Sequence, residues 1–367
     1  MASTIIQIIS IFLLFLFGSI YPVISNTILT YQFTYKDKIY LQFQQPWFQT
    51  FLAFIGMSFF IIPSLVITRC KEDINNNNNS GLAVFRSSSL SSIFGIFSLA
   101  LQTYSLIYMP VHIWQIFNEF YLLFTALFSI IYNGKKLHIT DWIGLFFVVL
   151  GISFAGVSAL IRSISERTEL TTELFFSFIL QILSHCLKAF VELGEDSLLK
   201  SSSSLTITAY EGLWGVYIIS LIILPFVNIT KYNLIGFHEY SPDILTFFKS
   251  SKFLIALEIF FVISITIYRF CEIYLQGTSK EKKSIFESLL PITVWFTSFV
   301  KYKIHKSASV SPFFDNYSYI EIAGLVITLF GSLMYHKIIK LPCFVYSKES
   351  LGSTKDIQIV PDKYVLD

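Results

Sequence analysis

Long apolar runs alternate with short polar stretches along almost the whole chain. A helix needs about 20 mostly apolar residues to cross a bilayer, and ten runs are close to that length. They are Ile5–Ile24, Thr50–Ile67, Leu90–Met109, Val111–Tyr132, Trp142–Ile161, Leu174–Leu193, Thr208–Val227, Phe253–Tyr274, Ser284–Tyr302 and Ile320–Ile339. Runs of this length are too long for barrel strands, so the pattern predicts an all-α membrane protein with ten transmembrane helices.

The first run could be mistaken for a signal peptide because of its position. No Lys or Arg precedes Lys36, and the run exceeds the roughly 7–15 apolar residues typical of such signals. We therefore predict a retained helix. Between the runs we expect a low-complexity loop at 71–92, with its row of asparagines, and a longer polar connection at 228–252.

An internal repeat relates the two halves of the chain. The fifth run carries Gly144 and Gly151, and the tenth carries Gly324 and Gly331 at the same spacing, which suits close helix packing. In the preceding runs, the tripeptide ending at Asn118 parallels the one ending at Glu287. Chance recurrence of glycines in apolar helices is the alternative. A repeat of five helices is odd-numbered, so the second copy would be inverted, as in many transporters.

The repeat predicts the organisation of the chain. Residues 1–161 would form the first five-helix repeat, 162–173 a linker, 174–340 the second five-helix repeat and 341–367 a polar tail. Lys and Arg are almost evenly divided between the two sides of the membrane, so they barely decide the orientation. With both ends cytoplasmic, Asn228 and Asn316 lie in sequons on the opposite side and are candidates for glycosylation.

Composition supports the same class. Hydrophobic residues make up 54% of the 367 residues and charged residues 14%, whereas an average soluble domain has about 25% charged residues. So few charges exclude a soluble globular protein, and a disordered chain needs the opposite balance. The net charge of +2 does not indicate a nucleic-acid partner. The four cysteines are far apart, which excludes a disulfide scaffold or a zinc module.

Polar and ionisable residues recur inside the runs at helical spacing. Such groups are costly in lipid, so they are expected to face the interior of the bundle. The candidate substrate-binding residues are Gln115, Asn118, Glu119, Gln181, Lys188, Glu192, Arg269 and Glu287. The alternative is that they only hold helices together: Lys188 with Glu192, and Arg269 with Glu272, have the spacing of ion pairs.

Common motifs for catalysis and nucleotide binding are not found in the sequence. It has no Walker loop, no Gly-x-Ser-x-Gly, no His-Glu-x-x-His and no dinucleotide fingerprint. We therefore expect no enzyme activity, no cofactor and no metal site.

Several segments together resemble the drug/metabolite transporter superfamily with EamA-type repeats. Within it the chain looks most like the F branch of the solute carrier 35 family, its F6-like members. The resemblance rests on colinear residues, none decisive alone: Gly18-Ser19-Ile20, Phe43-Gln-Gln-Pro46-x-x-Gln49, Leu127-Phe-Ser129, Trp142-x-Gly144, Gln181, Glu192, Glu211-Gly212-Leu213, Leu289, Trp295, Gly324, Gly331 and Tyr335. One departure concerns charge. Where the branch has Gln-x-x-Arg, this chain has Gln115-x-x-Asn118, and the family's Asp is Glu287 here.

The resemblance implies a nucleotide-sugar-transporter-like carrier in an internal membrane such as the Golgi or lysosome. We expect it to move a small polar metabolite by alternating access, as an exchanger or with protons carried by Glu119 or Glu287. Its partners would be the small-molecule substrate and the lipid bilayer, with a homodimer as one candidate assembly. The rival is a non-transporting receptor or scaffold that binds partners through its tail. It predicts fully paired polar stripes without a central cavity.

Overall fold

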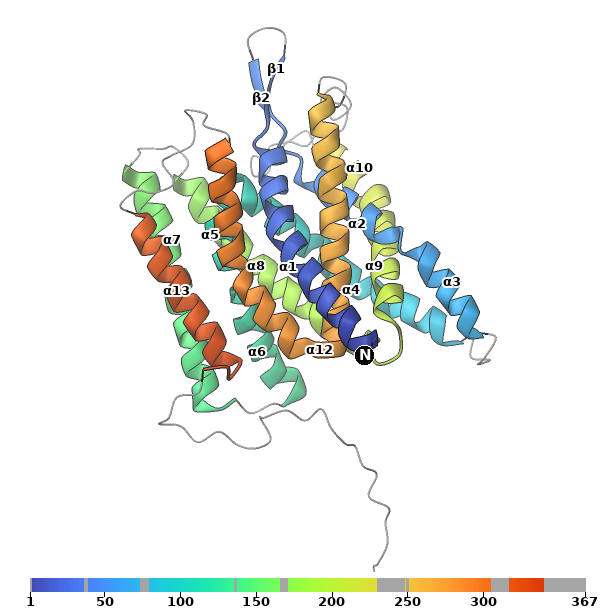
Figure 1. The fold of residues 1–367 in the computed structure, drawn as a ribbon. Coiled ribbons are helices and arrows are strands. Elements are labelled where there is room, and N and C mark those ends of the chain that lie inside the picture. Colours follow the sequence, from blue (N-terminus) through green and yellow to red (C-terminus); the bar gives the residue numbers. More distant parts are fainter. Residues whose placement is uncertain are drawn as a thin grey trace, which may run out of the picture.

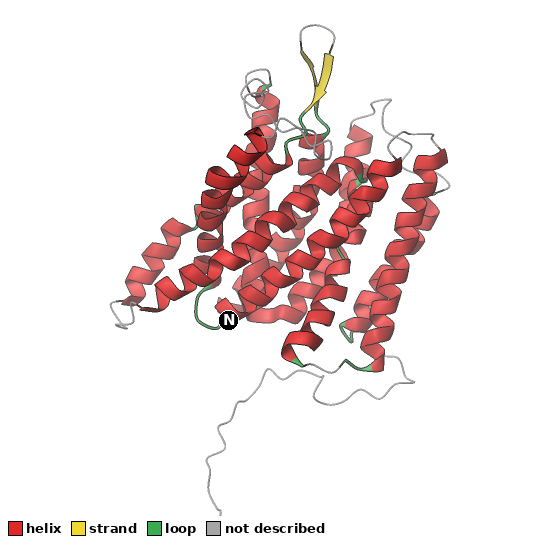
Figure 2. Ribbon diagram, turned by 180° about the vertical axis from the view of Figure 1, so that it is seen from behind, coloured by secondary structure: helices red, strands yellow, loops and turns green. Residues whose placement is uncertain are grey.

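The computed structural model describes residues 2–35, 39–72, 79–134, 137–165, 171–229, 248, 251–304 and 317–339. Most of these residues are helical, and the long helices stand side by side in one bundle (Figures 1 and 2). The predicted tail at 341–367, the sequon residue Asn316 and most of the 228–252 connection lie outside the described residues.

The helices follow the apolar runs, with some of the runs divided. Their bounds are α1 Ala2–Leu29, α2 Pro46–Ser58, α3 Ile61–Glu72, α4 Asn79–Tyr108, α5 Val111–Phe117, α6 Phe120–Asn133, α7 Ile139–Ser165, α8 Thr171–Leu198, α9 Ser204–Ile218, the π-helix η1 Ile219–Ile223, α10 Leu224–Ile229, α12 Lys252–Ile304 and α13 Ser318–Tyr335. An antiparallel hairpin, β1 Gln32–Tyr35 and β2 Ile39–Gln42, corrects the all-α expectation for this short segment. Its residues lie outside the predicted spans.

The described residues contain nine helical segments that are long and apolar enough to cross a membrane. The protein is therefore an integral, multi-pass membrane protein. Helix α12 has 53 residues, which at 1.5 Å per residue is far longer than a bilayer core of about 30 Å. Its backbone is non-helical at Ser279, and Figure 1 shows two arms that run in opposite directions. The two arms correspond to the eighth and ninth predicted spans.

Helix α4 begins inside the predicted loop at 71–92. Its first turns are rich in serine and form no continuous apolar run, so hydropathy alone predicts no membrane span there. Some of these serines, Ser88, Ser91 and Ser92, are nevertheless buried. Ser91 Oγ donates to Glu211 Oε1 of α9 at 2.5 Å, and Ser92 Oγ donates to the Glu211 carbonyl oxygen at 3.2 Å. Hydropathy marks the lipid-facing part of a helix and misses a part that is buried against polar partners.

Helices α7 and α13 pack closely along their glycines. A Cβ atom on Gly151 would lie 2.5 Å from the Gly324 carbonyl oxygen, and one on Gly324 would lie 2.7 Å from the Gly151 carbonyl oxygen. Gly144 and Gly331 face each other in the same way, at 2.9 and 2.6 Å. Only glycine fits at such close approaches of two backbones, so these four positions fix how the two helices meet.

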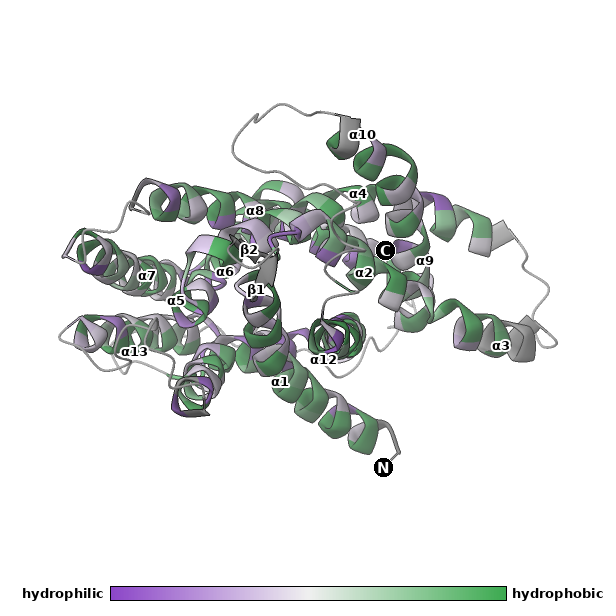
Figure 3. Cartoon of the chain, turned by 90° about the horizontal axis from the view of Figure 1, so that it is seen from above, coloured by the Kyte–Doolittle hydropathy of each residue, from purple (hydrophilic) through white to green (hydrophobic). Residues whose placement is uncertain are grey.

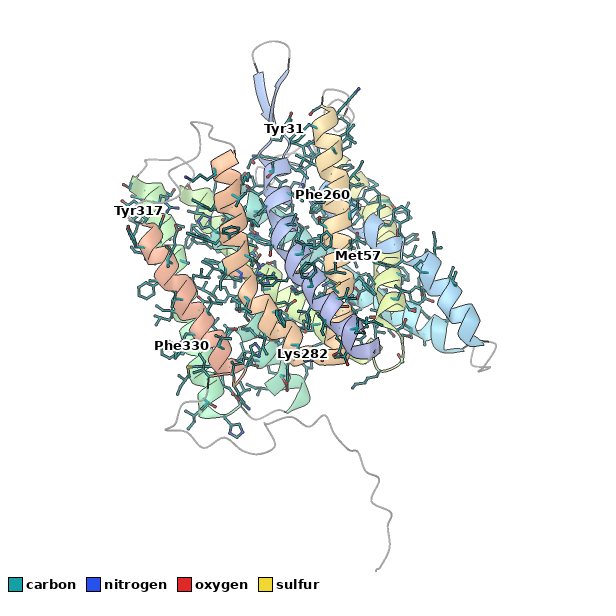
Figure 4. All side chains as sticks on the ribbon, viewed as in Figure 1. Tyr31, Met57, Phe260, Lys282, Tyr317 and Phe330 are labelled. Carbon is teal, nitrogen blue, oxygen red and sulfur yellow. The ribbon has the colours of Figure 1, made fainter. Side chains whose placement is uncertain are left out.

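The outer surface of the bundle is apolar. Phe146, Phe296 and Val326 are each about 60% exposed, and many other large aliphatic and aromatic side chains are also exposed. Seen from above, hydrophobic residues colour a large part of the helices (Figure 3). In Figure 4, Tyr31 and Lys282 mark opposite ends of the bundle. This surface suits a lipid environment, with polar groups concentrated inside and at the two ends.

Candidate functional site

The fourth predicted span is interrupted at two of its candidate residues. Helix α5 ends at Phe117 and α6 begins at Phe120, with Asn118 and Glu119 between them. The backbone hydrogen bonds here join residues three apart, whereas an α-helix joins residues four apart. The amides of Glu119 and Leu122 donate to carbonyl oxygens three residues earlier, at 3.2 and 3.0 Å. A short 3₁₀ stretch inside a helix is typical of a hinge or functional position.

The polar stripe of α8 meets this interruption. Gln181 Nε2 donates to Asn118 Oδ1 at 2.7 Å, and His185 Nε2 lies 2.9 Å from the same oxygen. Ser105 Oγ donates to Gln181 Oε1 at 2.5 Å. Trp114 Nε1 in turn donates to Ser105 Oγ at 3.0 Å. Both groups that contact Asn118 Oδ1 therefore belong to α8, and Ser105 of α4 orients one of them, Gln181.

Closer to the C-terminal end of α8, ion pairs connect this helix to α12. Lys188 Nζ lies 2.9 Å from Glu272 Oε1. Arg269 Nη1 lies 2.5 Å from Glu272 Oε2, and Arg269 Nη2 lies 2.8 Å from Glu195 Oε1 and 3.6 Å from Glu211 Oε2. The three carboxylate groups are almost fully buried. Buried charges are tolerated only when they are paired in this way.

A second group of ion pairs lies closer to the turn of α12. Lys283 is only 2% exposed, and its Nζ lies 3.1 Å from Glu192 Oε1 and 3.2 Å from Gln276 Oε1. Lys280 Nζ contacts Asp196 Oδ2 at 2.5 Å. Lys280 is half exposed, so this second pair belongs to the edge of the bundle.

Two small cavities lie beside these networks. The first, named here the Glu287 cavity, has a volume of about 30 Å³ and is lined by Gln115, Asn118, Glu119, Tyr121, Leu122, Lys188, Tyr268, Ser284, Glu287, Ser288 and Leu290. The second, the Arg269 cavity, has a volume of about 50 Å³, and Arg269, Glu211, Glu272 and Ser91 are among its lining residues. Lys188 and Tyr268 line both cavities, so they stand between them.

Five of the eight candidate residues line the Glu287 cavity, namely Gln115, Asn118, Glu119, Lys188 and Glu287. Arg269 lines the other cavity. Gln181 donates a hydrogen bond to Asn118, which lines the Glu287 cavity. Glu192 pairs with Lys283, and Lys283 Nζ also lies 3.7 Å from Glu272 of the Arg269 cavity. Sequence reasoning missed Lys283 as a buried residue and treated it as a loop charge. Its position four residues before Glu287, on the same helical face, was the available signal. Nothing in the sequence pattern marks Tyr121 and Tyr268 as cavity residues, because tyrosines occur along the whole chain.

Residues that correspond in the predicted repeat lie next to each other at this cavity. Asn118 corresponds to Glu287, and both line it. Glu119 then corresponds to Ser288, and Ser288 Oγ donates to Glu119 Oε2 at 3.2 Å. The glycine contacts are related by the repeat in another way. Gly144 and Gly151 correspond to Gly324 and Gly331, so the contact of Gly144 with Gly331 corresponds to the contact of Gly151 with Gly324.

Two atoms of the lining lack hydrogen-bond partners among the described residues. They are Gln115 Oε1 and Glu287 Oε1, both inaccessible to bulk solvent. The Gln115 residue is 3% exposed. Buried polar atoms without a partner are rare in folded proteins and need a specific explanation.

The chain is similar to several known proteins. Residues 5–157 match the EamA-like transporter family. The chain is 24% identical over 262 residues to the uncharacterized protein C12G12.12 of Schizosaccharomyces pombe, covering 69% of this chain and 75% of that protein. It is 22% identical over 312 residues to solute carrier family 35 member F6 of Homo sapiens, covering 80% of this chain and 78% of that protein. A solved crystal structure aligns with 92% of this chain and 98% of its own, at 13% identity and a TM-score of 0.46.

Proposed function

We propose that this chain carries a small polar metabolite across a membrane by alternating access. Its residues 5–157 match the EamA-like transporter family, and the chain is similar to solute carrier family 35 member F6, which supports the proposal. The solute would bind at the Glu287 cavity and the adjoining Arg269 cavity. The polar residues that line them belong to helices surrounded by apolar surface.

One observation carries this proposal: the Glu287 cavity lies where corresponding residues of the two predicted repeats meet. In a structure with a two-fold pseudo-axis, corresponding residues contact each other only near that axis. The Glu119–Ser288 hydrogen bond and the shared lining by Asn118 and Glu287 have this property. Transporters built from inverted repeats bind their substrates at the repeat interface, near the bilayer midplane.

The proposed repeats are residues 1–161 and 174–340, each with five crossings. The count of ten crossings is reached when the two arms of α12 are counted separately at Ser279. The reciprocal glycine contacts of α7 and α13 support the same symmetry, since each helix ends its own repeat.

Alternating access also needs places where helices bend. The 3₁₀ stretch at Asn118 and Glu119 divides α5 from α6 next to the cavity. In the corresponding second arm of α12, Pro291 removes one backbone hydrogen bond four residues after Glu287. Both cavities are far smaller than the roughly 300–1,000 Å³ typical of sites for small organic molecules. We interpret the structure as a closed state between two open ones.

Transport can be tested without knowing the substrate. Purified protein in liposomes would be incubated with a mixture of unlabelled amino acids, amines, nucleotides, nucleotide sugars and organic acids. Mass spectrometry of the washed liposomes then identifies any solute that enters. We expect at least one solute to accumulate only when the protein is present, and to be lost in a Glu119→Gln, Glu287→Gln double variant.

The rival function, a receptor or scaffold, would leave the interior fully paired. The partnerless atoms Gln115 Oε1 and Glu287 Oε1 favour the transporter proposal. If no solute enters the liposomes, and a variant truncated after residue 340 loses a binding partner in cells, the scaffold is supported instead.

A further inference from the structure

The partnerless atoms of the Glu287 cavity are all hydrogen-bond acceptors. Gln115 Oε1 can only accept, and Glu287 Oε1 accepts whenever its carboxyl group is ionised. Glu119 lines the same cavity and accepts a hydrogen bond from Ser288 Oγ. A solute that completes this site must therefore bring hydrogen-bond donors.

The basic groups nearby are already engaged by carboxylates. Lys188 Nζ is held 2.9 Å from Glu272 Oε1, and Lys283 Nζ is held 3.1 Å from Glu192 Oε1. Arg269 is shared by three carboxylates. A phosphate group in the cavity would find no uncommitted cation among these three residues. It would also face two further carboxylates, those of Glu119 and Glu287.

The charges around the cavity favour a cation. Across the cavity and the ion pairs beside it, six carboxylates stand against three basic groups. The carboxylates belong to Glu119, Glu192, Glu195, Glu211, Glu272 and Glu287, and the basic groups belong to Lys188, Arg269 and Lys283. The ring of Tyr121 lines the cavity and already attracts the ammonium groups of the two lysines, whose nitrogens lie 5.1 and 5.7 Å from its centroid. Aromatic faces combined with carboxylates are typical of sites that bind organic cations.

We propose that the Glu287 cavity binds the protonated amino group of the transported solute, with N–H donors directed at Gln115 Oε1 and Glu287 Oε1. This inference rests on the proposed transport function and adds the class of substrate, a primary amine. A volume of about 30 Å³, at roughly 10–15 Å³ for one water, accommodates a head group of two or three heavy atoms. The rest of the solute would extend toward the Arg269 cavity across Lys188 and Tyr268.

The test measures the melting temperature of the full-length protein in nanodiscs with four probes at matched ionic strength. Methylammonium carries both charge and donors, tetramethylammonium carries charge without N–H donors, potassium chloride controls for salt, and UDP-glucose represents anionic substrates. A ligand that binds only the folded state raises the melting temperature in a saturable way. We expect a saturable rise of about 2 °C or more with methylammonium, and none with the other three probes.

Variants assign the effect to the cavity. Glu287→Gln should weaken methylammonium binding by about 10-fold or more, because a charge-assisted hydrogen bond is lost. Glu287→Asp should keep part of the shift. Glu258→Gln is the matched control: Glu258 is a buried glutamate of the same helix that does not line the cavity. Should Glu287→Gln fail to fold, Gln115→Leu supplies the same test from the second acceptor.

Three results would overturn the amine proposal: stabilisation by UDP-glucose alone, an equal methylammonium shift in wild type and Glu287→Gln, or an equal shift from tetramethylammonium. The liposome experiment separates this failure from failure of the transport proposal. If anions enter liposomes while amines neither enter nor bind, transport stands and the substrate class is wrong. If amines bind but no solute enters, the site stands and the transport proposal is wrong.

Discussion

At the residue scale, paired charges in the interior matter most. Arg269 connects three buried carboxylates from α8, α9 and its own helix. Removing one member of such a cluster leaves the others as unpaired charges in a medium that solvates them poorly. The sequence predicted the pair of Arg269 with Glu272 from its spacing alone. It did not predict Glu195 and Glu211 as partners, because helix-to-helix neighbours have no signature in a single sequence.

The first prediction concerns this cluster. Arg269→Met should lower the stability of the protein by about 3–5 kcal/mol, measured as a fall in melting temperature in nanodiscs. Lys280→Met is the control, because the Lys280–Asp196 pair is half exposed at the edge of the bundle and is worth about 0–1 kcal/mol. Equal losses in the two variants would show that Arg269 contributes no more than a surface charge.

The second prediction concerns proton coupling. Glu119→Gln and Glu287→Gln, each alone, should abolish any dependence of solute flux on an imposed pH gradient, since neither amide can carry a proton. Other charged groups beside the cavity, Lys188, Lys283 and Glu272, are left in place by these changes. Flux into liposomes with and without a pH gradient is the measurement. Unchanged flux and unchanged pH dependence in both variants would remove the two glutamates from the mechanism.

At the element scale, the contact of α7 with α13 is set by glycines. The end of α13 also contacts α12, because His336 Nε2 lies 2.9 Å from Ser284 Oγ. The glycine spacing was visible in the sequence. Which glycine faces which depends on the antiparallel packing of the two helices, and this packing is a tertiary property. The interruption between α5 and α6 was equally hidden, because an apolar run of about 22 residues looks like one continuous helix.

The third prediction concerns helix packing. Gly151→Ala and Gly324→Ala should each destabilise the protein by about 1–3 kcal/mol, because the new methyl group would overlap backbone of the other helix. Gly81→Ala is the control: its Cβ would meet nothing within 4 Å, so alanine should be neutral or stabilising in that helix. Melting temperatures of the three variants decide. A neutral result at Gly151 and Gly324 would mean that the helices separate easily.

The fourth prediction concerns His336, which follows the last membrane-spanning residue of α13. Burial lowers the pKa of His336 to about 4, and its Nε2 lies 2.9 Å from Ser284 Oγ. The unfolded chain, with a histidine pKa of about 6.5, then binds a proton that the folded protein excludes. The stability that the uncharged His336 contributes at neutral pH should therefore be lost as the pH falls from about 6.5 toward 4.

The measurement for His336 is the melting temperature from pH 7.5 to 4.5 in wild type and His336→Gln. Glutamine keeps a hydrogen-bonding side chain without the titration. The variant should be less sensitive to acid over that window. Identical pH profiles would mean that His336 is as accessible to protons when folded as when unfolded.

At the scale of the whole molecule, α12 determines the topology. Its two arms run in opposite directions with Ser279 at the turn, and Lys282 lies at the end of the bundle opposite Tyr31 (Figures 1 and 4). If each arm crosses the membrane, the start and the end of α12 lie on one side and the turn on the other.

The fifth prediction tests that topology with cysteine labelling. In a variant without the four native cysteines, Lys252→Cys and Lys303→Cys should react with a membrane-impermeant maleimide added from one side of sealed vesicles. Lys282→Cys should react only from the other side, which it shares with a tag at the N-terminus. All three positions are exposed, so access to the reagent is matched. Labelling of all three from the same side would contradict two crossings by α12.

The sequence by itself determined the class of this protein and the positions of its apolar helices, because burial in lipid requires runs of about 20 apolar residues whatever the fold. It also indicated the polar residues that must avoid lipid, among them Gln115 and Glu287. Only the tertiary structure decided which of them meet. Whether a buried charge such as Lys283 finds a carboxylate, and whether an acceptor such as Gln115 Oε1 is left without a donor, depends on neighbours from distant helices. Helical periodicity fixes the face on which a residue lies, and packing fixes what that face contacts.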